Sequence, residues 1–177
     1  MSFLNRIFGA QLFGERQERA TLAPLYRAVV AEGRDPFWYR DGGVPDTIDG
    51  RFDLVSSVLA LVLLRMEAEG PAARRAEVLL TEVFIEDMDG TVRQLGIGDQ
   101  VVGKHVGKMM GALGGRLGAY RDAGGEPAAF AAAVERNVFR GDAPSPDAVA
   151  LVAARLTALR GALAAVPYAE LLAGRIR

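Results

Sequence analysis

The side chains best suited to chemistry in this sequence are carboxylates in two short stretches. Asp46, Asp49 and Asp53 form the first stretch, and Asp87 and Asp89 form the second. Carboxylates brought together can act as general acid and general base when their surroundings set their pKa values apart. The residue types alone therefore permit a carboxylate-dependent enzyme.

A structural role for the same carboxylates is the interpretation we favour. Acidic side chains at a helix start satisfy free backbone N–H groups and interact well with the helix dipole. A buried carboxylate also needs a basic partner, because an unpaired charge in a protein interior is costly. The sequence offers such partners in Arg51, Lys104 and Arg116. We therefore expect an ion-pair network and no catalytic residues.

Composition removes other kinds of site. The sequence has no cysteine and a single histidine, His105, which excludes thiol catalysis, disulfides, cysteine-ligated zinc and a two-histidine relay. Asp87-Met88-Asp89-Gly90 resembles part of a calcium loop but lacks the further oxygen ligands of an EF-hand. The 21 Lys and Arg residues nearly balance 22 Asp and Glu residues, which argues against a broad nucleic-acid surface. We expect neither a metal nor another cofactor.

A central helix must position the first group of carboxylates. The run from Leu54 to Leu64 is apolar on every side except for Ser56 and Ser57, so other helices or lipid must surround it. The run is too short to span a bilayer and charged residues bracket it, which favours a core helix. Alanine, leucine and glycine dominate the composition, and no strong strand pattern is present. These features predict an all-α, single-domain bundle of about six to eight helices around the buried helix.

Apolar spacing and residues typical of helix ends predict the other elements. We expect Asp46 and Asp49 to cap the central helix, and Pro24 to start or kink the first one. Asp87 falls on the predicted packed face of its helix, so we expect a basic partner for it from elsewhere in the chain. The predicted helices are 15–32, 36–39, 72–95, 99–123, 126–139, 146–163 and a short turn after Pro167. Residues 1–14 are expected to form a flexible N-terminal segment before a helical domain of residues 15–177.

The predicted helix 99–123 has a row of glycines beside its apolar stripe: Gly103, Gly107, Gly111, Gly114, Gly115 and Gly118. Each glycine inside a helix costs about 0.5–1 kcal/mol relative to alanine, so the row predicts a compensating close contact. Small residues at this spacing let two helix backbones approach each other. The central helix offers a matching narrow ridge at Ser56, Ser57 and Ala60.

A binding groove is a second interpretation of the same region. Glycines, methionines and aromatic residues can line an adaptable apolar groove for a partner helix. The alternative, which we favour for most of these residues, is burial in the protein's own core. Sequence alone does not separate the two.

The first eight residues indicate where in the cell the protein is located. Met1 to Phe8 is apolar but short, and no small-residue cleavage site follows it, so we expect no secretory signal and a cytoplasmic protein. Phe3, Leu4, Ile7 and Phe8 share one helical face. We expect this segment to dock on the core or to fray, and a weak anchor at the cytoplasmic face of the inner membrane is the alternative.

Several ordered motifs together resemble the ubiquinol–cytochrome c chaperone family. They are Gly43-Val44-Pro45-Asp46-Thr47, Asp49-Gly50-Arg51-Phe52-Asp53, Glu86-Asp87-Met88-Asp89, Leu95-Gly96-Ile97-Gly98-Asp99 with Val102-Gly103-Lys104, and Leu171-Leu172-Ala173-Gly174-Arg175. The resemblance extends from about Leu25 to the end of the chain, and ordered motifs in combination are more specific than any one alone. We expect no transit extension before these motifs, and therefore a bacterial rather than a mitochondrial member.

The resemblance implies an all-α assembly chaperone for ubiquinol–cytochrome c reductase that shields newly made cytochrome b. Mitochondrial relatives act near the ribosomal exit, so the ribosome is a further implied partner. We expect the client to bind near a polar network and an apolar wall. The candidate residues are Phe37, Trp38, Asp46, Asp49, Arg51, Asp53, Asp87, Asp89, Gly103, Lys104, Gly107, Met109, Arg116 and Tyr120. Two rival functions stay open at this point: a homodimeric scaffold joined through the glycine helix, and the carboxylate enzyme.

Overall fold

The computed structural model describes the backbone of residues 3–94 and 99–177, and the side chains of residues 17–90 and 107–177. The described residues contain helices and no strand, which confirms the predicted all-α fold. The helices are α1 (Phe3–Gly33), α2 (Phe37–Arg40), α3 (Ile48–Glu67), α4 (Arg74–Gln94), α5 (Asp99–Ala123), α6 (Pro127–Val138), α7 (Pro146–Ala165) and α8 (Tyr168–Leu172), with a 3₁₀ turn at Gly70–Ala73.

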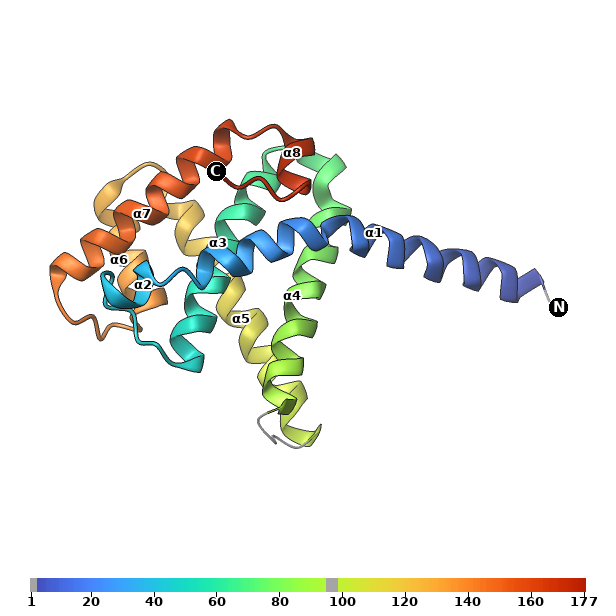
Figure 1. Cartoon of the computed structure of the whole chain (residues 1–177), viewed down its shortest axis with the longest axis horizontal. Helices are drawn as coiled ribbons and strands as arrows, with labels where there is room; N and C mark the ends of the chain where they lie inside the picture. The colour runs from blue at the N-terminus through green and yellow to red at the C-terminus, as the bar shows by residue number, and fades with distance from the viewer. Residues whose placement is uncertain (1–2, 95–98) are drawn as a thin grey trace.

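Helix α3 is the centre of the bundle, as predicted. Its residues from Asp53 to Leu63 are all buried, and α1, α4, α5, α6 and α7 all contact it. Figure 1 shows these helices crossing around α3, with α4 and α5 side by side. An apolar helix needs cover on every side, and five neighbouring helices supply it.

Helix α1 is longer than predicted. It runs without interruption from Phe3 to Gly33 and includes Pro24, which neither starts nor ends it. Its N-terminal half extends away from the bundle instead of docking on it, as Figure 1 shows. The side chains of residues 3–16, which include the apolar face for which a membrane anchor was the alternative, lie outside the described residues.

The start of α3 differs from the prediction in one residue. Thr47, not Asp46, is the N-cap, and its side-chain oxygen accepts a hydrogen bond from the Gly50 N–H at 3.1 Å. Asp49 lies in the first turn, where its negative charge complements the helix dipole. Gly50 is required here, because a Cβ at this position would lie 2.0 Å from the Pro45 carbonyl oxygen.

The predicted close contact along the glycine row is wrong. A Cβ added at Gly107, Gly111, Gly114, Gly115 or Gly118 would meet no atom within 4 Å. Helix α5 packs on α3 through larger side chains such as Leu113, Arg116 and Tyr120, which are all buried. The close approach to α3 is made instead by Gly33 at the end of α1, where a Cβ would lie 2.8 Å from the Val55 Cα.

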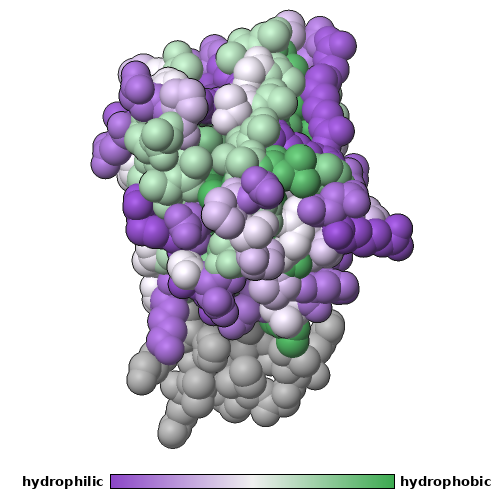
Figure 2. Space-filling view, turned by 90° about the vertical axis from the view of Figure 1, so that its left-hand side faces the viewer, coloured by the Kyte–Doolittle hydropathy of each residue, from purple (hydrophilic) through white to green (hydrophobic). Residues whose placement is uncertain are grey.

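Helix α7 covers one side of the bundle. Its inner face buries Val152, Leu156, Leu159 and Leu163. By length and composition, α7 is the one helix among the described residues apolar enough to cross a membrane, and 39% of its apolar window is buried. Leu151 on α7 is 41% exposed. Figure 2 shows a mainly hydrophobic area in the upper part of one face of the molecule, bordered by hydrophilic side chains.

Candidate functional site

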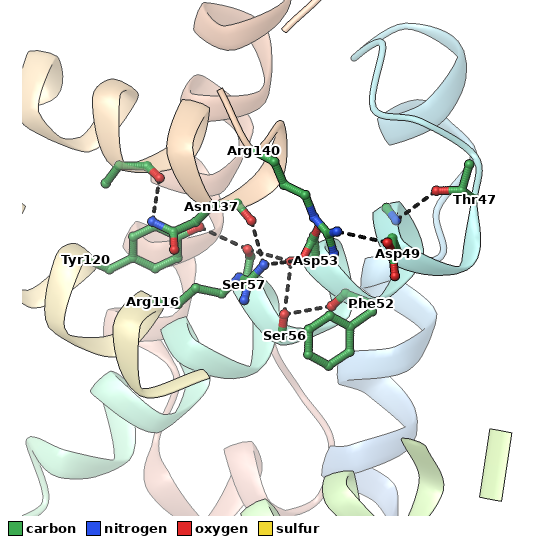
Figure 3. Close-up of polar contacts among 12 residues, drawn as sticks. Thr47, Asp49, Phe52, Asp53, Ser56, Ser57, Arg116, Tyr120, Asn137 and Arg140 are labelled. Carbon is green, nitrogen blue, oxygen red and sulfur yellow. Dashed lines mark hydrogen bonds and ion pairs between the residues drawn. The ribbon is translucent and has the colours of Figure 1, made fainter. Parts of the chain in front are cut away.

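The predicted network forms around one buried carboxylate, Asp53 on α3. Arg116 on α5 donates a hydrogen bond to Asp53 Oδ1, and Arg140 donates through Nε to Asp53 Oδ2 at 2.7 Å. Arg140 also donates to Asp49 at 2.8 Å, and Arg116 donates to the Asn137 carbonyl oxygen at 2.6 Å. Figure 3 shows these groups converging on Asp53 from α3, α5 and the end of α6.

The network continues inward along α3. The Ser57 hydroxyl donates to the Asp53 carbonyl oxygen at 2.7 Å and accepts from the Tyr120 hydroxyl at 3.0 Å. Arg116 also lies over the ring of Phe52, 5.6 Å from its centroid. The bond from Tyr120 ties α3 to α5, whereas Ser56 donates to the Phe52 and Asp53 carbonyl oxygens within α3. The two serines that interrupt the apolar run are therefore hydrogen-bonded core residues.

The electrostatics of Asp53 are those of a compensated buried ion. Burial raises the pKa of the Asp53 carboxyl group, and the guanidinium groups of Arg140 and Arg116 oppose this by favouring the charged form. The side chains of Asp53 and Arg116 are 3% and 4% exposed. Because both carboxylate oxygens already accept hydrogen bonds and water is largely excluded, this centre is suited to holding helices together. The predicted ion pair between this group of carboxylates and Arg116 is present, at Asp53.

Sequence reasoning missed Arg140. This residue follows the end of α6 with a positive φ of 57°, a conformation that is unfavourable for a residue with a Cβ. Its two ion pairs compensate for that backbone conformation. The sequence contains one clue, Gly141, which directly follows and also has a positive φ.

The remaining acidic residues are spread apart. Asp46 pairs with Arg51 at 2.7 Å on the surface, where both side chains are 56% exposed. Asp87 is exposed rather than packed, and it accepts a hydrogen bond from the Tyr26 hydroxyl at 2.7 Å. Asp89 is half-buried on α4. Among the described residues, no three acidic, histidine or cysteine side chains are placed to hold a metal ion.

The predicted apolar wall separates into two parts. Phe37 and Trp38 lie at α2, where the Arg155 guanidinium is 4.3 Å and 4.5 Å from their ring centroids. Trp38 is fully buried and donates to the Glu32 carbonyl oxygen at 2.7 Å. Met109 and Tyr120 are buried on α5. Of the remaining α5 candidates, Gly107 is exposed. The surroundings of Gly103 and Lys104 lie outside the described residues.

An open groove lies beside α5, the helix for which an apolar binding groove was the alternative interpretation of the sequence. It has a volume of about 580 Å³ and is bounded by residues of α1, α3, α4 and α5. Its apolar lining residues are Leu63, Val78, Ile85, Met110 and Leu117, and its acidic ones are Glu67, Glu77, Glu82 and Glu86. Val78 and Met110 are 52% and 45% exposed. We call this feature the α4–α5 groove.

Comparisons with known proteins agree with the fold and the motifs. A family model described as Ubiquinol-cytochrome C chaperone matches residues 40–177. The solved structure described as "Crystal structure of the Cbp3 homolog from Brucella abortus" is similar to this chain, with 33% sequence identity and a TM-score of 0.78 over 93% of each chain. The comparison with curated proteins gave no match. The chain therefore belongs to the ubiquinol–cytochrome c chaperone family, and its role is that of a chaperone for this respiratory complex.

Proposed function

We propose that this chaperone binds newly made cytochrome b and shields it until it joins ubiquinol–cytochrome c reductase. The observation that carries the proposal is the family match over residues 40–177, which includes the residues around Asp53 and both walls of the α4–α5 groove. The structural relative from Brucella abortus supports the same role, since it extends over nearly the whole chain.

The proposed mechanism is shielding without catalysis or nucleotide. A membrane subunit exposes apolar surface before its partners are bound, and covering that surface prevents aggregation. Heme and neighbouring subunits then replace the chaperone. The described residues suit a binding role, because their buried carboxylate is saturated by ion pairs and an apolar groove is open to the solvent. The protein acts in the cytoplasm, at the membrane where its client is inserted.

The test is a crosslinked pull-down of the tagged protein from its own host, analysed by mass spectrometry. The proposal predicts enrichment of cytochrome b over other membrane proteins of similar abundance, with ribosomal proteins if capture begins during synthesis. Absence of cytochrome b from a host that still makes the complex would show that the client differs.

The carboxylate enzyme makes a different prediction. An Asp87→Asn variant of an enzyme would fold normally and lose turnover of a small substrate. The chaperone proposal predicts that Asp87→Asn captures as much cytochrome b as the unchanged protein, because Asp87 lies outside the α4–α5 groove lining.

A further inference from the structure

The α4–α5 groove gathers exposed apolar side chains at one place. Four large apolar residues among the described ones are strongly exposed: Ile48, Val78, Met110 and Leu151. Val78 and Met110 both line this groove, with Leu63, Ile85 and Leu117 beside them. Single exposed apolar residues are ordinary on protein surfaces, whereas a concave cluster marks a binding surface. Methionine and valine at its mouth offer an apolar contact that can adapt to different side chains.

The glycine row of α5 opens on the same side. Gly114 is four residues after Met110 and three before Leu117, so the three positions share one helical face. A Cβ at Gly114 or at Gly111 would meet no atom of this chain within 4 Å. The helix cost of these glycines is therefore not offset by packing inside the chain. A partner helix lying on this face could bring its backbone close to α5.

The rim of the groove is acidic. Glu67, Glu77, Glu82 and Glu86 line it, with Arg19 as the one basic residue among the lining side chains. Arg19 bonds to Glu82 and Glu86, and Arg121 bonds to Glu67. Glu77 Oε1 is shielded from solvent and accepts no hydrogen bond among the described residues. Burial raises the pKa of Glu77, the Glu67 carboxylate adds to the effect, and the Arg74 charge opposes it. The Oε1 atom of Glu77 is therefore an acceptor at the rim that a donor on a partner could use.

We infer that the α4–α5 groove is the client site and that it binds an apolar helix flanked by lysine or arginine side chains. The apolar floor buries one face of the client helix, the open glycines let that helix lie close to α5, and the acidic rim pairs with its basic flanks. This inference rests on the proposed chaperone function and adds to it the surface and the chemical class of client segment.

The outer face of α7 is a weaker alternative. It includes Leu151, but the small pocket at the start of α7, lined by Pro146 and Val149, does not include Leu151 and has one acidic lining residue, Glu135. Leu151 therefore supplies a matched control, because its exposure of 41% is close to the 45% of Met110.

The direct test uses synthetic helices of about 18 residues, five turns long, labelled with a fluorophore. One has leucines along one face with lysines on both flanks, and its control has glutamates in place of the lysines. We expect the lysine helix to bind in fluorescence anisotropy, with affinity that falls as salt is raised, and the glutamate helix to bind at least about tenfold more weakly. Equal binding of the two helices, or no binding of either, would overturn the inference.

Three variants locate the binding surface. Met110→Lys should weaken binding of the lysine helix about tenfold or more, because it places a positive charge among the apolar residues at the mouth of the groove. Leu151→Lys should leave binding unchanged. Gly114→Leu should raise the melting temperature, because glycine is a poor helix former, and still weaken binding by filling the open face. Greater stability with weaker binding is a combination that a purely structural role of Gly114 does not produce. Loss of binding in Leu151→Lys alone would place the site on α7 and overturn the inference.

The host pull-down separates this inference from the proposed function. If the unchanged protein and Met110→Lys capture equal amounts of cytochrome b, cytochrome b is supported as the client and the assignment of the client site to the groove is wrong. If neither captures cytochrome b, the proposed function fails, and the peptide measurements still decide whether the groove binds a basic-flanked helix. A homodimer dissociated by Met110→Lys, in a protein that binds neither peptide, would assign the groove to self-association and overturn the inference.

Discussion

Asp53 and Asp46 belong to the same motif but have opposite surroundings. The Asp53 side chain is 3% exposed and bonds to two arginines, whereas the Asp46 side chain is 56% exposed and bonds to Arg51. When a buried charge loses its ion-pair partner, no water is available to solvate it. A surface charge that loses its partner is solvated by water. Asp53 and Asp46 therefore allow the contribution of a buried ion pair to stability to be compared with that of a surface ion pair in the same short segment.

Arg116→Met should strongly destabilise the protein, because it removes a partner of the buried Asp53 carboxylate. Removal of one member of a buried ion pair costs about 3–5 kcal/mol of unfolding free energy. Urea denaturation followed by circular dichroism measures this change. Asp46→Asn is the control and should leave the denaturation midpoint almost unchanged. A loss for Arg116→Met no larger than that control would mean that the network does not hold α5 on α3.

Gly50→Ala should also destabilise the protein, since the added Cβ would lie 2.0 Å from the Pro45 carbonyl oxygen. Forcing extra atoms into a closed site costs about 1–3 kcal/mol. Gly111→Ala is the matched control, because its Cβ meets no atom within 4 Å, and it should stabilise α5 by about 0.5–1 kcal/mol. Thermal unfolding measures the change in stability of each variant. A change in the same direction for both would contradict the difference in space around Gly50 and Gly111.

Only part of the residue-level site could be predicted from the sequence. Arg116 was predicted as one of three basic partners of the acidic residues, but the sequence did not predict that Asp53 is the buried member of the network. Arg140 could not be predicted in the same way, since its position depends on a left-handed turn after α6 that places it against α3. Asp87 was assigned to a packed face by spacing, but its side chain lies at the exposed edge of α4.

At the scale of elements, most helix bounds followed from local rules, with α1 as the exception, and the residues that make the packing contacts did not. Helix α5 was predicted at 99–123 and found at Asp99–Ala123, because an acidic residue marks its start and glycines follow its end. The same helix shows what local rules omit. Its glycines predicted a close neighbour, but the sequence does not show whether that neighbour is another helix of the chain or another molecule.

The end of α7 provides a test at the element scale. Arg65 on α3 donates to the Leu163 and Val166 carbonyl oxygens, both at 3.0 Å, and so satisfies groups that the end of α7 leaves free. Arg65→Met should lower the unfolding free energy by about 2 kcal/mol, because hydrogen bonds from a charged donor are lost. Hydrogen exchange measured by mass spectrometry should show faster exchange in the last turn of α7, with α5 unaffected. Unchanged exchange at that turn would contradict this capping role.

At the scale of the whole molecule, all four tyrosines should resist ionisation. Burial raises the pKa values of Tyr26, Tyr39, Tyr120 and Tyr168, with Tyr39 at about 12. A phenol whose pKa is higher in the folded than in the unfolded state loses stabilisation as pH rises through its unfolded value of about 10. Stability should therefore fall above about pH 10.

Tyrosinate absorbance and circular dichroism, recorded together against pH, measure this effect. The absorbance should rise only as the helical signal is lost. A full rise in tyrosinate absorbance with the helical signal intact would mean that the tyrosines are not protected by the fold.

The α4–α5 groove is the feature furthest from the sequence. Its lining residues come from four helices, and each of them alone is an ordinary residue of an amphipathic helix. Met110 on α5 and Val78 on α4 remain exposed in this groove although the two helices are in contact, which is a result of packing across the bundle. The family resemblance predicted a client protein. The structure adds a surface, the α4–α5 groove, at which binding of that client can be tested.

The central claim is that the chain holds cytochrome b only between synthesis and assembly. The direct measurement is a pulse–chase experiment in the host, with the tagged chain recovered at successive times. We predict labelled cytochrome b on the chain immediately after the pulse, and its transfer to the assembled complex during the chase. Absence of labelled cytochrome b from the chain at every time, while the complex acquires label normally, would contradict the account.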